Sequence, residues 1–315
     1  MSVLKKTMLA RIAWLYYINK KTQEQIASIY NISRPSVQRY LNQALNSKIV
    51  ITRINHKNIN ECMELSEQLT ERFNLKLCDI APCHPNDTEN EIKSNLGEVG
   101  AQIMARFIRN LKPITVALGS GSTLQECIDR IDSFNRPEHN ITSLAGMTTP
   151  EGTPSKFDLV TSFAQKTRSR RYYLPAPLVL PSSKERSNLQ SLSIYRVVES
   201  LGLNADVTFV SISPLLNDSP FRREGLIDKD ELNKLKEKGA CGEILGQVFD
   251  EKGLLIQSAF NERLAGVRIN PPTKRLIVGI SGSPAKHLPL LASLRGKWIN
   301  GLVTDEQTAR YLLQH

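Results

Sequence analysis

Residues 22–45 read TQEQIASIYNISRPSVQRYLNQAL, and this stretch decides the fold of the amino-terminal part of the chain. The opening TQEQ fits a capping box, in which the threonine caps a helix and the glutamine three positions later bonds back to the cap. Asn31 tolerates the left-handed backbone of a short turn. Ser33 is a good cap for the next helix, and Pro35 falls in its first turn, where the missing N–H costs little. The stretch therefore predicts a helix-turn-helix.

The second helix of this pair has an apolar stripe on one face and polar side chains on the other. Val37, Leu41, Ala44 and Leu45 recur at helical spacing and predict the buried face. The polar face offers groups that bond phosphates and base edges, since arginine matches guanine and glutamine or asparagine matches adenine. A recognition helix places such residues in the major groove. We therefore expect double-stranded operator DNA to be contacted by Arg34, Pro35, Ser36, Gln38, Arg39 and Asn42.

The positive charge of the chain is concentrated at the same end. The 315 residues include 41 Lys and Arg against 31 Asp and Glu, a net charge of +10. Residues 1–60 hold ten of these bases and a single acid, Glu24, so this segment carries +9. The remaining residues hold 31 bases and 30 acids, which leaves +1. These charges favour a polyanionic partner for the first fifth of the chain.

Further elements surround the helix-turn-helix. Thr7–Ile18 has apolar residues at helical spacing and predicts a helix. Ile49–Ile54 alternates and is β-branched, which predicts a strand that would form the wing of the domain. The polar run Asn55–Asn60 predicts a linker. Glu61–Phe73 predicts an amphipathic helix, whose apolar face serves either a dimer contact or packing on its own domain.

From residue 74 onward, candidate strands and helices alternate, which favours a parallel sheet in an open α/β fold. The strand candidates are 75–81, 114–118, 141–145, 171–174, 205–211, 276–280 and 298–303. The helix candidates include 89–111, 228–238, 285–294 and 305–313. The domains expected are a winged helix-turn-helix over residues 1–56, a linker helix over residues 57–73 and an effector-binding α/β domain over residues 74–315.

Ligands of such sheets bind beyond the carboxyl ends of the strands, and three glycine-containing loops follow predicted strands. The first, Gly119-Ser120-Gly121-Ser122-Thr123, opens a helix, where backbone N–H groups, hydroxyls and the helix dipole favour an anion. It lacks the lysine of a Walker loop, and a plain strand-to-helix turn explains it equally well. The second loop, Ala145–Thr149, contains Gly146 and Thr148.

The third loop, Ser281–Lys286, contains Gly282 and ends in a lysine at the start of a predicted helix. A cation is unfavourable there against the helix dipole, and a bound anion would offset this cost. We therefore expect Lys286 to contact a ligand rather than solvent alone. Glu243 lies between apolar residues, where it can accept hydrogen bonds from sugar hydroxyls or simply be a loop acid.

Other patterns exclude several classes of protein. The cysteines are odd in number and show no CxxC spacing, so neither a zinc site nor a disulfide framework is expected, and Cys83-His84 is interpreted as a loop pair. No apolar run reaches the roughly 18 residues of a membrane span, and no secretory signal is evident. We expect a cytoplasmic protein without metal or cofactor.

Several motifs, in one order across essentially the whole chain, resemble the SorC family of bacterial sugar-responsive transcription regulators. They are Thr22-Gln-x-x-Ile26-Ala27, Ser33-Arg34-Pro35-Ser36-Val37-x-Arg39, Gly119-x-Gly-x-Thr123, Leu174-Pro-Ala-Pro177, Gly239-Ala-x-Gly242-Glu243-Ile244, Phe249-Asp250-x-x-Gly253, Gly282-x-x-x-Lys286 and Leu302-x-Thr-Asp-Glu306-x-Thr-Ala309-x-x-Leu312-Leu. The resemblance implies a winged helix-turn-helix joined to a Rossmann-like effector domain related to phosphosugar isomerases. It also implies tetramers, arranged as dimers of dimers, and a sugar, polyol or sugar-phosphate inducer.

The resemblance further implies the residues of the effector site. On matching positions, that site would be lined by Ser122, Thr123, Thr148, Glu243 and Lys286, and the three loops add Gly119, Ser120, Gly121, Gly146 and Gly282. Many members of the family have Arg in place of Ser122, Asp in place of Glu243 and Gly-Gly in place of Ser281-Gly282. These departures leave the inducer open, although parts of the chain are similar to erythritol-type and autoinducer-2-type members. A polyol or its phosphate is the inducer we expect.

The function predicted is a DNA-binding regulator, and a repressor rather than an activator, of a carbohydrate or polyol catabolic operon. The chain is not expected to be an enzyme. The alternative is a sugar-phosphate isomerase with an appended DNA-binding arm, but isomerisation needs a positioned base, and no clustered Asp-Gly-Ala-Asp motif is present. A constitutive DNA-binding scaffold without an effector is the third possibility.

Overall fold

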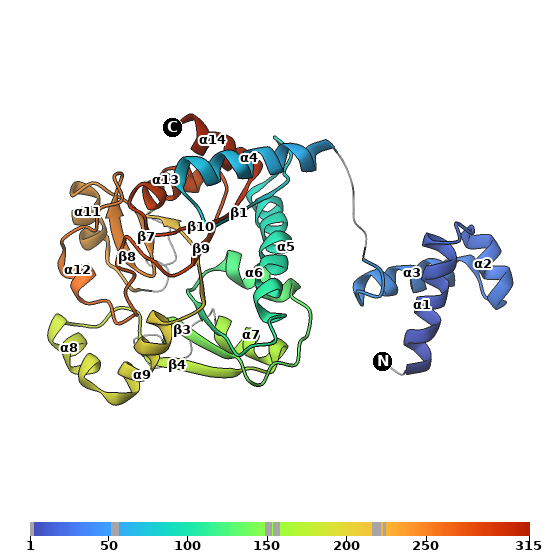
Figure 1. Cartoon of the computed structure of the whole chain (residues 1–315), viewed down its shortest axis with the longest axis horizontal. Helices are drawn as coiled ribbons and strands as arrows, with labels where there is room; N and C mark the ends of the chain where they lie inside the picture. The colour runs from blue at the N-terminus through green and yellow to red at the C-terminus, as the bar shows by residue number, and fades with distance from the viewer. Residues whose placement is uncertain (1–2, 52–56, 149–152, 154–157, 216–221, 223–224) are drawn as a thin grey trace. The chain divides into compact units, whose positions relative to one another are not determined.

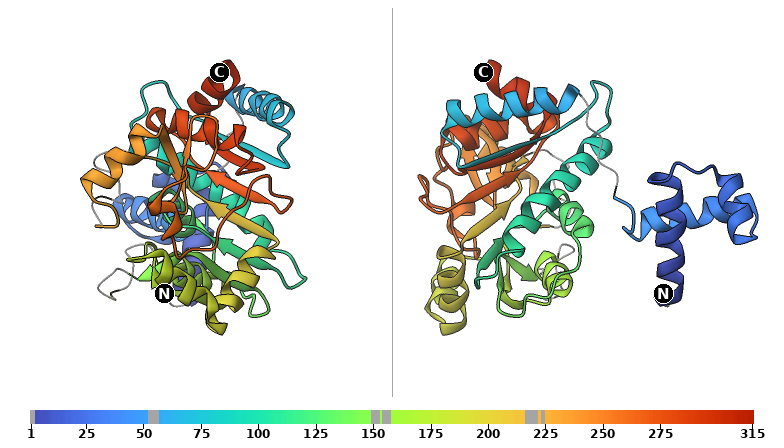
Figure 2. Two further views of the ribbon diagram at one scale, coloured as in Figure 1. Left: turned by 90° about the vertical axis from the view of Figure 1, so that its left-hand side faces the viewer. Right: turned by 45° about the vertical axis from the view of Figure 1, so that its right-hand side comes forward.

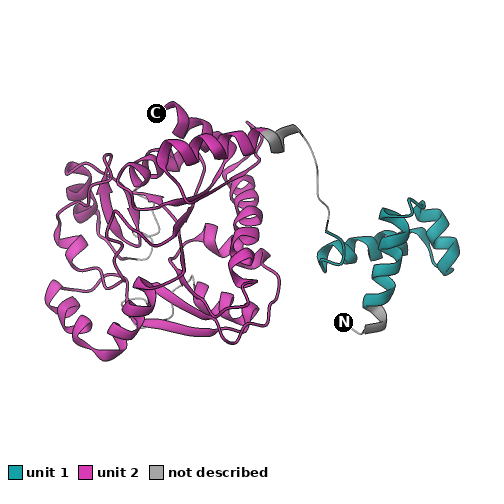
Figure 3. Cartoon of the chain, in the orientation of Figure 1, with its two compact units in different colours: residues 1–56 teal, residues 57–315 magenta. Residues whose placement is uncertain are grey.

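The chain divides into two compact units, residues 1–56 and residues 57–315 (Figure 3). The computed structural model describes residues 3–51, 57–148, 153, 158–215, 222 and 225–315. Each unit has a hydrophobic core of its own. Within the described ranges, no helix combines the length and the apolar character that crossing a membrane requires.

Unit 1 is a bundle of three helices, α1 (Val3–Tyr17), α2 (Gln23–Tyr30) and α3 (Arg34–Asn46) (Figure 1). The local signals act as predicted: the capping box opens α2, Asn31 ends it with φ 50° and ψ 48°, and the Ser33 hydroxyl caps α3. The core is formed by Leu9, Ile12, Ala13, Ile26, Val37, Leu41 and Ala44.

Leu45 does not belong to this core, contrary to the predicted stripe. It is 38% exposed, because the turn of the helix carries it beyond the edge of the face formed by Val37, Leu41 and Ala44. Three apolar positions of α3 are therefore enough to hold it against α1 and α2.

The predicted wing strand Ile49–Ile54 is wrong over its described residues. Ile49 and Val50 form a bend and donate their N–H groups back to the carbonyl of Ala44, at 2.9 and 3.2 Å. Their side chains pack against the three-helix core, so these β-branched residues close the end of α3 instead of pairing with a strand. Residues 52–56, which include the rest of the predicted strand, lie outside the described residues.

Unit 2 is built on a seven-stranded sheet in which every neighbouring pair is parallel, so the predicted α/β class is confirmed. The strand order is β1-β10-β9-β5-β2-β3-β4. The strands are β1 (Leu77–Ala81), β2 (Thr115–Leu118), β3 (Asn140–Thr148), β4 (Arg170–Pro177), β5 (Val207–Val210), β9 (Ile277–Ile280) and β10 (Gly301–Asp305). From β4 to β10 this is the doubly wound order 3-2-1-4-5-6, with β1 added at the edge beside β10. The order reverses between β2 and β5, where such sheets bind their ligands.

Helices cover both faces of this sheet (Figures 1 and 2). The helices that share one hydrophobic core with the sheet are α5 (Glu89–Ile108), α6 (Ser122–Arg130) and α7 (Leu159–Thr167). The opposite core includes side chains of α4 (Lys57–Phe73), α13 (His287–Arg295) and α14 (Glu306–Gln314). Strand β2 shows the division, because Ala117 faces one core while Val116 and Leu118 face the other.

Several elements of unit 2 differ from those predicted. Helix α4 begins at Lys57, so residues 57–60 of the predicted linker are helical. Its apolar face packs on β1 and α14, which is the own-domain packing left open above. Glu243 lies in a strand instead of a loop. The elements that were not named in advance include α7, α8 (Ser183–Ser191), α9 (Ser193–Leu203), α12 (Ala259–Glu262) and a small antiparallel sheet of β6 (Ser213–Pro214), β7 (Ala240–Ile244) and β8 (Gln247–Asp250).

Candidate functional site

The predicted DNA-contacting residues share the solvent-facing side of α3. Arg34, Pro35, Gln38, Arg39 and Asn42 are exposed, and Ser36 is half-buried. They alternate with the buried positions of the stripe, so packing of α3 in the core fixes the direction in which they point. The structure thus gathers the whole predicted set on one face of one helix.

Hydrogen bonds join this face to α2. Gln23 donates from its side-chain amide to that of Gln38, and Gln38 donates to Asn42 Oδ1 at 3.3 Å. Arg34 Nε pairs with Glu24 Oε1 at 3.2 Å. Gln23 was not predicted, although the capping box places it in the first turn of α2, where it can reach the recognition helix. The side-chain amides of Gln23 and Gln38 hold each other in position. Glu24 likewise holds Arg34, and a phosphate would have to displace Glu24 in order to pair with this arginine.

In unit 2, the first and third predicted loops lie at the carboxyl ends of the neighbouring strands β2, β5 and β9. Gly119 N–H donates to the carbonyl of Phe209 at 2.8 Å, which ties the first loop to β5. Ser281 Oγ donates to the carbonyl of Ile212 at 2.9 Å, which ties the third loop to the segment that follows β5. Gly121 has φ 128°, a conformation that favours glycine, and it opens α6. The strand reversal therefore brings both loops to one place.

Lys286 and Thr123 meet across this place. Lys286 Nζ lies 3.5 Å from Thr123 Oγ1, although the residues are 163 positions apart. Thr123 is buried in the first turn of α6, and Lys286 is half-buried immediately before α13. Burial lowers the pKa of the Lys286 ammonium, while the carboxylates of Glu89 and Glu243 oppose this change. A partly desolvated cation at the start of two helices is well placed for a polar or anionic ligand.

Glu243 lies close to this pair on the small antiparallel sheet. It is 7% exposed, and its Oε2 accepts from the N–H of Gly246 at 2.9 Å. It pairs in register with Ser213 of β6, and β6 packs against the turn that carries Lys286. Burial raises the pKa of Glu243 to about 7, and the Gly246 N–H, Ser213 and Lys286 act in the opposite direction. Near neutral pH this carboxyl can donate a hydrogen bond as well as accept one, as recognition of hydroxyl groups requires.

The other predicted residues have different surroundings. A Cβ at Gly146 would clash with the carbonyl of Ala176, so this glycine permits the close approach of β3 and β4. Thr148 ends β3 opposite Pro177, one strand further from Lys286. Ser120 is half-buried and Ser122 is exposed at the start of α6.

Asp305 is a functional candidate that sequence reasoning missed. It is fully buried at the end of β10 and accepts the N–H groups of Thr308 and Ser283, each at 2.9 Å. A Cβ at Gly282 would clash with its carboxylate. An aspartate before a helix with a threonine three positions later is a cap signal, but the contact with the third loop has no local signature.

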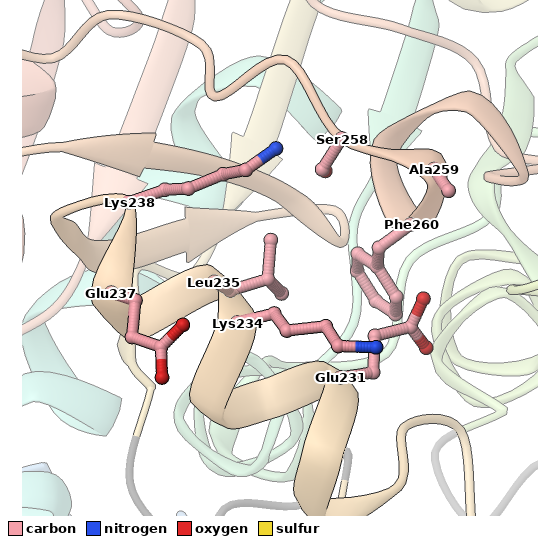
Figure 4. Close-up of a pocket in the computed structure, with 8 residues that line it drawn as sticks. All are labelled: Glu231, Lys234, Leu235, Glu237, Lys238, Ser258, Ala259 and Phe260. Atoms are coloured by element: carbon pink, nitrogen blue, oxygen red, sulfur yellow. The ribbon is translucent and has the colours of Figure 1, made fainter.

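One surface pocket of unit 2 contains no residue of the predicted effector set. This pocket of about 300 Å³ is lined by Glu231, Lys234, Leu235, Glu237, Lys238, Ser258, Ala259 and Phe260 (Figure 4). Two of its four charged side chains have partners: Glu231 pairs with Arg263 at 2.7 Å, and Lys238 Nζ donates to the carbonyl of Gln257 at 2.9 Å. These two side chains are therefore less available to a ligand.

The described ranges contain no group of three or more His, Cys, Asp and Glu side chains that could hold a metal ion. The Cys83 thiol donates toward Asp305 Oδ1 at 3.8 Å, and burial raises its pKa to about 11. A thiol with so high a pKa is a poor metal ligand, because the thiolate is the form that binds metal.

Comparison with known proteins gives relatives along the whole chain. The chain is 25% identical over 303 residues to the erythritol catabolism regulatory protein EryD of Brucella abortus, covering 96% of this chain and 95% of that protein. It is 28% identical over 323 residues to the transcriptional regulator LsrR of an Enterobacter species, covering 99% and 94%. The full-length sorbitol operon regulator SorC of Klebsiella pneumoniae has the same fold, with a TM-score of 0.76 and 24% identity over 99% of both chains.

A family model described as "Putative sugar-binding domain" matches residues 57–314, which is nearly all of unit 2. This match and the regulators above confirm the resemblance drawn from the sequence motifs. Because this match covers most of the chain, the chain belongs to the Sugar-bind family.

Proposed function

We propose that this protein, a sugar-responsive transcriptional regulator, represses a carbohydrate or polyol catabolic operon until an effector binds unit 2. The observation that carries the proposal is the meeting of Lys286 with Thr123 at the strand reversal of a sugar-binding domain, in a chain that also presents an exposed polar recognition helix. An effector that binds the two DNA-binding states unequally shifts the population between them.

In the DNA-binding role, Arg34 and Arg39 supply the charged contacts, and Ser36 and Gln38 read base edges. Asn42 and the backbone near Pro35 contact the phosphate backbone. Gln23 and Glu24 orient these side chains in the absence of DNA. The charge of +9 on residues 1–60 makes the affinity strongly salt-dependent.

In the effector role, Lys286, Thr123 and the first turn of α6 bind the charged or most polar end of the ligand, and Glu243 bonds its hydroxyls. The full proposed set is Gly119, Ser120, Gly121, Ser122, Thr123, Gly146, Thr148, Glu243, Gly282 and Lys286. The names of three similar proteins concern erythritol catabolism, a sorbitol operon and deoxyribonucleosides. These names support a polyol, a sugar or a phosphate ester of either as the effector.

One observation favours an enzyme as the second candidate. A buried carboxyl whose pKa is about 7, as for Glu243, is suited to general base catalysis. We propose that the chain is not an enzyme, since the relatives along its whole length are transcriptional regulators. Turnover of pentose or hexose phosphates by the purified protein would reverse this assignment.

We also propose a tetramer, arranged as a dimer of dimers, in the cytoplasm, where the operator is accessible. A two-fold symmetric assembly predicts an operator with related half-sites. Sedimentation analysis of the full chain, with and without operator DNA, tests the tetramer.

The main experiment is a thermal-shift screen with erythritol, sorbitol, deoxyribose and their phosphates. A ligand that binds only the folded protein raises its stability, and above the dissociation constant this gain grows with the logarithm of ligand concentration. The compound that stabilises the chain should also release it from an operator fragment selected from random DNA. If a compound stabilises the chain without releasing DNA, it is a ligand but not an inducer. If no compound in an extended screen acts, the constitutive scaffold is the better description.

A further inference from the structure

One buried carboxylate holds both the loop of Lys286 and the last helix of the chain. Asp305 caps α14, since its Oδ1 accepts the N–H of Thr308 at 2.9 Å and its Oδ2 accepts the Thr308 hydroxyl at 2.6 Å. The same Oδ2 accepts the N–H of Ser283 at 2.9 Å, across 22 positions of sequence. An ordinary helix cap needs only the first of these bonds.

The loop is shaped around this carboxylate. Ser283 has φ 90°, a backbone conformation that residues other than glycine rarely adopt. A Cβ at Gly282 would clash with Asp305 Oδ2. The carbonyl of Ser283 then accepts the N–H of Lys286 at 3.0 Å, and this closes the turn that presents the lysine to Thr123. The position of Lys286 therefore depends on Asp305 through Ser283.

The other side of this link is the seam between α14 and α4, which lie side by side (Figures 1 and 2). Arg310 Nη2 lies 3.1 Å from Glu61 Oε2 on α4 and 2.8 Å from Glu306 Oε1 on α14. At the other end of the seam, Arg72 donates to the carbonyl of Leu313. Between these ends, the two helices share one core through Cys62, Leu65, Leu69, Ala309 and Leu312. A displacement of α14 therefore displaces α4, the helix with which unit 2 begins.

We propose that Asp305 is the positioning residue that couples the effector site to α14 and α4, and through α4 to the DNA-binding unit. The inference rests on the proposed function above. An effector that moves Lys286 must either carry Asp305 and α14 with it or leave a buried N–H of Ser283 without its acceptor, which is unfavourable. The first alternative transmits binding to the seam.

The first test is Asp305→Asn, because the NH2 group of the amide cannot accept a hydrogen bond and would face the backbone N–H of either Thr308 or Ser283, which the carboxylate now accepts with separate oxygens. The quantity measured is the ratio of operator dissociation constants with and without saturating erythritol 4-phosphate, or erythritol where the screen selects it. A coupled wild type should give a ratio on the order of tenfold or more. In Asp305→Asn the ratio should fall towards one, while both separate affinities change much less.

Arg310→Gln should reduce the same ratio in part, and the double variant should be no worse than Asp305→Asn alone, because the two residues act in one chain of contacts. Arg295→Gln is the matched control, since Arg295 bonds the carbonyl of His315 rather than α4. An unchanged ratio in a folded Asp305→Asn variant, or equal loss in Arg295→Gln, would overturn the proposal.

A second test needs no effector, so it separates this inference from the proposed function. Gly282→Ala puts a Cβ against Asp305 Oδ2 and so displaces the carboxylate, while the N–H groups that it accepts stay in the chain. Hydrogen exchange of the full chain should then become faster in the first turn of α14 and in α4, far in sequence from the substitution. Faster exchange confined to residues 281–287 would refute the coupling even if Asp305→Asn does not fold. Failure of every compound to release wild-type DNA would instead refute the proposed function.

Discussion

In unit 1 the proposed contact residues lie on consecutive turns of α3, whereas in unit 2 Thr123 and Lys286 meet from 163 positions apart. The groups of unit 1 are mostly exposed and include two arginines, whereas in unit 2 Thr123 and Glu243 are buried and Lys286 is half-buried. A single helix can display a DNA-reading face, because DNA is larger than the protein domain and supplies the concave surface. A small effector must be surrounded, so its site has to be assembled from several strands and loops.

The largest expected effect tests whether the two units are independent. Leu41→Ala removes a buried side chain from the core of unit 1 and should destabilise that unit by about 2–5 kcal/mol. The two tryptophans report separately, since Trp14 lies in unit 1 and Trp298 is fully buried in unit 2. Calorimetry and tryptophan fluorescence should show the unfolding transition of unit 1 moving to a lower temperature, while that of unit 2 stays unchanged. Leu232→Ala, the control, should shift only the transition of unit 2, and one shared transition would contradict the division.

The buried carboxyl of Glu243 should make the stability of unit 2 depend on pH. The folded pKa of Glu243 is raised from 4.5 to about 7, so the protonated carboxyl stabilises unit 2 fully below pH 4.5. This contribution, of up to about 3 kcal/mol, is lost as pH rises through about 7. Urea unfolding should show wild type losing stability between pH 4.5 and 8 relative to Glu243→Gln. An equal difference at all pH values would exclude the raised pKa, and Glu237→Gln on the surface serves as control.

Lys286→Ala should weaken effector binding without weakening operator binding. Loss of a charged hydrogen bond costs about 1.5–3 kcal/mol, so effector affinity should fall about 10- to 100-fold while operator affinity without effector stays unchanged. Titration calorimetry with the selected compound and a gel-shift assay measure the two quantities. Lys112→Ala removes an exposed lysine of unit 2 and should alter neither. If the effector releases the Lys286→Ala variant from DNA as it releases the wild type, this lysine does not belong to the effector site.

The smallest effect is expected from a single DNA contact. Arg39→Ala should weaken operator binding by about 1–3 kcal/mol at fixed salt and relax specificity at one base pair. Fluorescence anisotropy on the operator and on single-base variants measures both changes. Arg196→Ala, an exposed arginine on α9 of unit 2, is the control. Equal weakening on every sequence would identify Arg39 as a phosphate contact instead of a base contact.

The sequence was sufficient where local chemistry decides the structure. Caps, the turn residue and the periodicity of α3 placed the whole proposed DNA-contact set on the solvent-facing side of the helix without any long-range information. It was misleading at Ile49 and Val50, because β-branched residues also suit a bend that covers a small core. Local rules do not say which surface such residues will pack against.

In unit 2 the sequence located the strand-to-helix loops but not their neighbours. The pairing of Lys286 with Thr123 depends on the strand order, which brings β9 and β2 to either side of β5. The strand that holds Glu243 was missed because it belongs to a small sheet of short strands. Asp305 was visible only as a family motif, since its second role is a contact with Ser283 across 22 positions.

The position of β1 at the edge beside β10 also has a consequence for biosynthesis. Leu77–Ala81 pairs residue by residue with Gly301–Asp305, so the first strand of unit 2 can pair only after the last strand, β10, has been translated. Every core residue of unit 1 lies within the first 50 positions and leaves the ribosome early. A polypeptide that stalls before residue 301 would therefore display a finished DNA-reading domain beside an unfinished sensor. Under the proposed function, termination before residue 301 should produce chains that bind the operator and that no effector can release.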